Sequence, residues 1–260
     1  MKLYILLYIL YIYKSFYIVI IYIMGFNLWT NVAERPAHPV KQWGTWKWNK
    51  FVYWDKEFEN KDWTKGKEFD FEVPSEFIVV ADSHSAGWWI DAEGIWVCSN
   101  EIFFWDEPVI VKTQKKENQR TIMKWIYKDI KPDFKARKFE MKTNLYIITP
   151  DNPDDIKIIQ LRWAQLTDFT QSEAGKPYAT SSYKLKMDPT LRKGKKGRNE
   201  FEYPHFDIAS SLTPEEKELQ AKAAQRVLEH HNATKPTQEE FAEEKVEEPI
   251  ASVPETDLPF

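Results

Sequence analysis

Residues 51–166 form a succession of short segments that follow the two-residue period of a β-strand. The segment EFDFEV at 68–73 places Phe69, Phe71 and Val73 on one side and acidic residues on the other, as in a strand with one buried face. Further apolar or alternating runs lie at 75–82, 87–90, 95–99, 101–105, 108–113, 120–130, 138–150 and 154–166. About seven to nine strands at this spacing predict a mainly β fold, an antiparallel sandwich or small barrel over about residues 51–166.

The stretch GWWIDAEGIWVCSN at 87–100 predicts a hairpin. Its turn falls at 91–94, where Gly94 can adopt the positive φ that a tight turn needs. Exposed aromatic rings on such a hairpin are suited to holding sugar rings, so Trp89 and Trp96 form a candidate ligand platform. The alternative is that these indoles pack into the core of the domain.

The N-terminal residues 1–26 are predicted to form a transmembrane anchor. Leu3 to Ile23 contain one charged residue, Lys14, and as a helix they would span about 32 Å, close to the hydrocarbon thickness of about 30 Å. Lys14 near the middle costs about 2.5–3.5 kcal/mol, less than the apolar residues return. The alternative is a start of translation at Met24, because the residues that follow resemble the beginning of a soluble chain.

Residues 27–50 are interpreted as a Trp-rich arm that contacts a partner. Pro36 and Pro39 oppose regular structure there. The aromatic residues of the arm are Trp29, Trp43, Trp46 and Trp48. Such indoles favour protein partners or lipid headgroups, and the alternative is packing on the chain's own core.

Residues 167–211 lose the strand pattern and are interpreted as a basic linker. The candidate partner-binding residues in it are Lys193, Lys195, Lys196 and Arg198. Clustered cations of this kind can contact phosphate groups of ribosomal RNA or of anionic lipids. The basic cluster lacks interleaved aromatic residues, so nucleic acid is the less favoured partner.

A helix is predicted over 212–232. Thr213 precedes Pro214, and Glu216 follows three residues after Thr213, which is the pattern of a capping box. Only a thin apolar stripe runs along this helix, so it is expected to dock on a partner or to stand alone. The remaining residues, 233–260, are acidic and contain four prolines, which predicts an extended tail.

No motif for catalysis, a cofactor or a metal is found. Asp82, Ser83 and His84 are adjacent in a predicted strand, where neighbouring side chains point to opposite faces. The five histidines lack a metal-binding spacing. The single cysteine, Cys98, excludes an internal disulfide and is predicted to be buried and inert.

The sequence therefore favours a non-catalytic accessory or structural subunit of a membrane-bound multiprotein complex. The expected location is the mitochondrial inner membrane, in an assembly of the respiratory-chain or ATP-synthase type, with a single membrane pass. This expectation depends on the appendages, which bury too little surface alone to offset their ordering entropy. The alternatives are a membrane-tethered carbohydrate- or lipid-binding β domain and a mitochondrial ribosomal or RNA-associated protein. An enzyme would have to use Asp91, Glu93, Asp106 or His84.

Overall fold

The computed structural model describes residues 38–47, 49–54, 68–90, 94–104, 106–113, 120–126, 140–196 and 199–243. The predicted anchor at 1–26 lies outside these ranges, as do Trp29, Trp48, Arg198 and the tail beyond residue 243. Asp91 and Glu93 also lie outside them. In the part of the chain that is described, no helix is long and apolar enough to cross a membrane.

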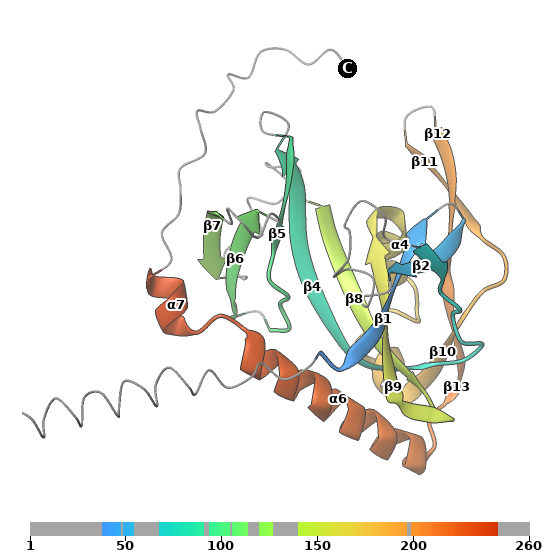
Figure 1. Ribbon diagram of the computed structural model, residues 1–260. Coiled ribbons are helices and arrows are strands. Elements are labelled where there is room, and N and C mark those ends of the chain that lie inside the picture. The colour runs from blue at the N-terminus through green and yellow to red at the C-terminus, as the bar shows by residue number, and fades with distance from the viewer. Residues whose placement is uncertain are drawn as a thin grey trace, which may run out of the picture. The chain divides into compact units, whose positions relative to one another are not determined.

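The main element is one nine-stranded sheet with the order β3-β2-β1-β9-β8-β4-β5-β6-β7 (Figure 1). Its strands are β1 (Val40–Lys47), β2 (Lys50–Trp54), β3 (Glu68–Asp70), β4 (Ile78–Ile90), β5 (Ile95–Ser99), β6 (Pro108–Thr113), β7 (Thr121–Ile126), β8 (Glu140–Thr149) and β9 (Asn152–Arg162). Neighbouring strands run antiparallel except β1 and β9, which are parallel. The sheet is therefore mixed.

The prediction of a mainly β fold is confirmed, but the prediction of an antiparallel sandwich or small barrel is not. Over the described residues the large sheet is open, with β3 and β7 at its edges. A sandwich buries one face of each sheet against another sheet, whereas here helices and a small strand pair cover the large sheet. Two further two-stranded sheets pair β10 (Tyr183–Met187) with β13 (Phe206–Ser211) and β11 (Arg192–Lys196) with β12 (Asn199–Tyr203).

The helix α6 (Pro214–Thr234) packs against part of one face of the sheet, and in Figure 1 it crosses the lower ends of the strands. Tyr146 and Ile148 of β8 and Ile158 of β9 form a buried apolar cluster with Ala223 and Val227 of α6. The thin apolar stripe of this helix is thus covered by the chain's own sheet. The expectation that the helix docks on a partner or stands alone is wrong for this face.

The opposite face is covered by α4 (Trp163–Gln171) and by the β10–β13 pair. Leu145 and Ile147 alternate with the residues of the first face and pack in a second cluster. Phe169 of α4, Leu185 of β10 and Phe206 of β13 complete this cluster. Two short helices, α5 (Pro177–Ser182) and α7 (Gln238–Glu243), lie elsewhere in the chain.

Two expected appendages are built into the fold. Within the expected Trp-rich arm, residues from Val40 onward form β1 and the start of β2, because β9 offers a partner for the backbone of β1. The expected linker at 167–211 contains most of α4, all of α5 and strands β10–β13. Tertiary packing overrides the weak local pattern of both stretches.

The capping box at the start of α6 is confirmed. Glu216 donates its backbone N–H to Thr213 Oγ1 at 3.2 Å, and the backbone N–H of Thr213 donates to the Glu216 carboxylate at 2.8 Å. These bonds satisfy two backbone donors that a helix N-terminus otherwise leaves unpaired. Lys184 forms an ion pair with the same carboxylate at 3.1 Å.

We expect Thr213→Ala to lower the free energy of unfolding by about 1 kcal/mol, because the N-cap acceptor is lost. Urea titration of the purified chain measures this change. Ser211→Ala, at an exposed position two residues earlier, is the control and should change stability by much less. Equal effects of the two substitutions would contradict the capping role.

We also expect the stabilising effect of Glu216 to depend on pH. The hydrogen bond from the Thr213 backbone, assisted by Lys184, lowers the Glu216 pKa below its ordinary value of 4.5. The stabilisation is therefore fully present above pH 4.5 and is lost as the pH falls through the lowered folded-state pKa. Melting temperatures from pH 6 to pH 3 should show wild type and Glu216→Gln converging in acid, and a constant gap would refute this.

Candidate functional site

An aromatic groove of about 920 Å³ is formed by three segments that are distant in sequence. The end of β1 contributes Trp46, the start of α4 contributes Trp163, and β12 contributes Phe201 and Tyr203. We call this site the aromatic groove. Both apolar and charged side chains line it, as in surfaces that bind extended polypeptides.

Trp163 is the most exposed large apolar side chain among the described residues, at 63%. Its backbone has a φ of 46°, a left-handed conformation that is uncommon for residues other than glycine. It is the first residue of α4, directly after the extended Arg162. A strained backbone that holds a large indole at the surface indicates a functional position more than a packing one.

The β11–β12 hairpin is fixed against the rest of the groove. Trp46 Nε1 donates to the carbonyl oxygen of Glu202 at 3.0 Å, and Asn49 Nδ2 donates to the carboxylate of Glu202 at 3.3 Å. The Phe201 ring lies over Gly194, where a Cβ atom would come within 2.5 Å of the ring. Any larger residue at 194 would displace this wall of the groove.

The three cationic side chains that line the groove differ in their contacts and in their exposure to solvent. Lys47 forms an ion pair with Glu68. Arg162 Nε donates to Gln160 Oε1 at 2.8 Å, and a guanidinium nitrogen lies 3.8 Å from Glu140. Burial lowers the pKa of Arg162 from its ordinary value. Lys193 is exposed at the hairpin.

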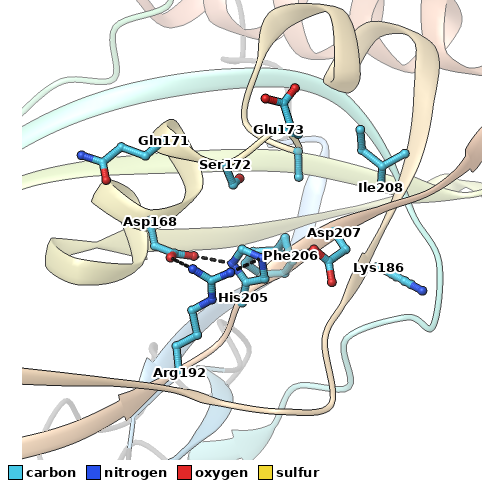
Figure 2. A pocket seen from close by; sticks show the side chains of 11 residues that line it. Asp168, Gln171, Ser172, Glu173, Lys186, Arg192, His205, Phe206, Asp207 and Ile208 are labelled. Atoms are coloured by element: carbon cyan, nitrogen blue, oxygen red, sulfur yellow. Dashed lines mark hydrogen bonds and ion pairs between the residues drawn. The ribbon is translucent and has the colours of Figure 1, made fainter.

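A charged cluster next to the groove joins α4 to the hairpin (Figure 2). Arg192 Nη1 donates to Asp168 Oδ1 at 2.7 Å, and His205 Nδ1 lies 2.5 Å from Asp168 Oδ2. The other ring nitrogen of His205 lies 2.9 Å from Arg192 Nη2 and 3.1 Å from Asp207 Oδ1. The cluster borders an open pocket of about 700 Å³.

An Asp–His pair of this kind can hold or move a proton, but its surroundings favour a structural role. Both ring nitrogens of His205 are already in contact with charged side chains, Asp168 on one side and Arg192 and Asp207 on the other. Ser172, the hydroxyl in the pocket, donates to the Phe169 carbonyl at 2.8 Å and accepts from the Gly175 N–H at 3.3 Å. That hydroxyl terminates α4 instead of pairing with the imidazole.

A buried row of polar side chains crosses the sheet face that α6 partly covers. Gln160 Nε2 donates to Asn144 Oδ1 at 3.0 Å, and Asn144 Nδ2 donates to the Glu101 carboxylate at 2.6 Å. Ser83 donates to the same carboxylate at 3.1 Å, and Tyr146 donates to it at 2.8 Å. Burial, followed by the charge of Glu101, raises the Tyr146 pKa.

The structure brings together two of the predicted partner-binding residues. Trp46 and Lys193 both line the aromatic groove. Trp43 packs instead against the cluster beneath α6. Lys195 lies on the exposed hairpin, and Lys196 is described by its backbone alone.

The predicted hairpin strands form as β4 and β5, with Trp89 directly opposite Trp96 and Gly94 at a φ of 62°. Trp89 is half exposed, at 52%. The Lys142 ammonium lies 4.7 Å from the centre of the Trp96 ring, which covers part of that indole. Burial is the main cause that lowers the pKa of Lys142.

Among the described residues considered for catalysis, Ser83 and His84 have different partners on the two faces of β4. His84 contacts Thr143 Oγ1 at 2.9 Å and Asp82 at 3.5 Å, while Ser83 bonds to Glu101 on the opposite face. Burial lowers the pKa of His84, against the opposing effect of Asp82. Cys98 was predicted to be buried, but it is only half-buried in β5.

Among the described residues, no group of three or more His, Cys, Asp or Glu side chains is arranged to hold a metal ion. Sequence reasoning missed Trp163, Phe201 and His205. Arg162 and Trp163 lie within the run 154–166 that was predicted as a strand, but β9 ends at Arg162 and α4 begins at Trp163.

No family model, curated protein or solved structure matches this chain. Its function is therefore inferred from geometry.

We expect the Asp168–Arg192 pair to couple more strongly than an exposed pair. Asp168 is 11% exposed, whereas Asp154, which pairs with Arg226 at 2.8 Å, is 91% exposed. Double-mutant cycles with alanine, read by urea unfolding, should give a coupling of about 1–2 kcal/mol for the first pair and below about 0.5 kcal/mol for the second. Equal couplings would contradict a structural role for the cluster.

Proposed function

We propose that this chain is a non-catalytic accessory subunit of a membrane-bound multiprotein complex, and that its aromatic groove receives an extended segment of a neighbouring subunit. The observation that carries the proposal is the exposed Trp163, which has a strained backbone and lines the same groove as Phe201 and Tyr203. Tryptophan and tyrosine anchors of this kind dominate the energetics of protein interfaces.

A polypeptide suits the groove better than a small polar ligand. The rings of Trp46, Trp163 and Phe201 offer broad apolar faces, and such faces dock extended and proline-containing segments. Charges of both signs lie along the groove, with Lys193 near Glu200 and Glu202. This mixture matches the polar rim of a protein interface.

The membrane and the mitochondrial location belong to the proposal. Support for a membrane comes from the apolar stretch at 3–23, and support for a reducing compartment comes from the single cysteine. β1 and α6 pack on the chain's own sheet and so do not themselves indicate a partner. The exposed rings of the aromatic groove are the main support for a partner subunit.

Photocrosslinking in native membranes tests the proposed contact between the aromatic groove and a neighbouring subunit. A photoreactive phenylalanine analogue at Phe201 or Trp163 should form one dominant adduct with another protein of the same complex, purified in mild detergent and identified by mass analysis. The same analogue at Tyr178, which is 53% exposed on α5 outside the groove, is the matched control and should form little of that adduct. Trp163→Ala should lower co-purification of the partner by about tenfold.

A chain that migrates alone in native purification would contradict the proposal. Equal crosslinking from Tyr178 and Phe201 would also count against the groove as the contact surface.

A carbohydrate-binding function is favoured by one observation, the half-exposed Trp89 next to Trp96. Glycan-array binding that Trp89→Ala abolishes and Trp163→Ala preserves would support it.

For RNA binding, the register of the β11–β12 hairpin is unfavourable, because Lys193 lies opposite Glu202 and Lys195 opposite Glu200. These acids offset the basic charge that phosphate binding requires.

A further inference from the structure

A second cavity, of about 270 Å³, lies between β1, the loop after β5 and the C-terminal part of α6. Its lining includes Trp43, Glu101, Phe103, Tyr146, His231 and Lys235. We call it the ring-lined pocket. It is separate from the aromatic groove and shares no lining residue with it.

Half of its lining residues carry an aromatic ring. The Phe103 ring lies 5.6 Å from the Tyr146 ring and 4.3 Å from the His231 ring, measured between centroids. On the other side, the His38 ring lies 6.1 Å from the Trp43 indole. The face of an aromatic ring carries negative electrostatic potential and attracts cations.

The one carboxylate of the pocket lacks a cationic partner among the described residues. Glu101 accepts hydrogen bonds from Ser83, Asn144 and Tyr146, and all three donors are neutral. Ser83, Asn144 and Tyr146 are each at most 2% exposed. Their hydrogen bonds hold the carboxylate in place but leave its negative charge uncompensated.

The cation in the pocket is already placed near another acid. Lys235 Nζ lies 3.8 Å from Glu107, a buried carboxylate that also contacts His231 Nε2 at 2.6 Å. The backbone N–H groups of Phe103 and Phe104 donate to the same Glu107. The ammonium of Lys235 is thus placed against Glu107 and not against Glu101.

We propose that the ring-lined pocket binds a small organic ammonium ion, with the ring faces around its cationic head and Glu101 as the counter-ion. Aromatic enclosures with an adjacent carboxylate recognise substituted ammonium groups, because the cation gains from the ring quadrupoles and from the acid together. The volume fits a metabolite-sized amine and is too small for a peptide. The site is independent of the aromatic groove and of the proposed partner.

Calorimetric titration of the full chain, in a non-ionic maltoside detergent, tests the proposal. Choline is the cationic probe, and 3,3-dimethylbutan-1-ol, which has the same shape without the charge, is the control ligand. We expect saturable binding of choline and at least about tenfold weaker binding of the neutral alcohol. This comparison needs no variant and so does not depend on the folding of one.

Two substitutions then locate the site. Glu101→Gln keeps the size of the side chain, removes its charge and should weaken choline binding by at least about tenfold. Glu76→Gln, at a carboxylate outside the pocket that pairs with Lys184, should leave binding unchanged. Lys235→Gln should strengthen choline binding, because it removes the competing cation.

Vesicles distinguish the source of the ligand. Binding to phosphatidylcholine but not to phosphatidylglycerol vesicles, lost in Glu101→Gln, would assign the site to a lipid headgroup, whereas binding of free choline alone would assign it to a soluble amine. Equal affinity for choline and the neutral alcohol, no binding of choline in either form, or weaker choline binding in Lys235→Gln would overturn the proposal. None of these results bears on the crosslinking from the aromatic groove.

Discussion

The fold depends on the alternation of apolar side chains in the central strands. In β8, Leu145 and Ile147 face one side of the sheet while Tyr146 and Ile148 face the other, and all four are almost fully buried. A strand that is apolar on both faces cannot leave either one to water. The sheet therefore needs a cover on each side, and α6 provides one while α4 and the β10–β13 pair provide the other.

This requirement explains why segments that were predicted to be appendages, the linker at 167–211 and the helix α6, pack on the large sheet. The covering elements are recruited from the C-terminal half of the chain. On the face that α6 covers, the polar row of Ser83, Asn144 and Gln160 replaces the apolar residues beyond Tyr146. Both candidate sites lie at an end of a covering helix, the aromatic groove at the start of α4 and the ring-lined pocket at the C-terminal part of α6.

The sequence predicted the elements that are determined by residues close to one another in the chain. The strands with clear alternation, the hairpin with Gly94 and the capping box of α6 are examples. The parallel pairing of β1, the strands β10–β13 and the open form of the sheet depend on contacts between distant segments. For the sites, Trp46 and Lys193 were recognisable by type, but the position of Trp163 depends on a backbone conformation that no pattern in the sequence indicates.

The parallel pairing of β1 with β9 joins Val40 to Ile156 and Thr45 to Gln160. Because translation proceeds from the N-terminus, β1 is made long before its partner strand leaves the ribosome. A non-local pairing of this kind requires the chain to lose the entropy of closing a long loop before the strand contacts form, and this cost slows folding. Trp43 and Trp46 would stay uncovered during that interval, so the nascent chain would be a natural client for a chaperone that shields aromatic surface.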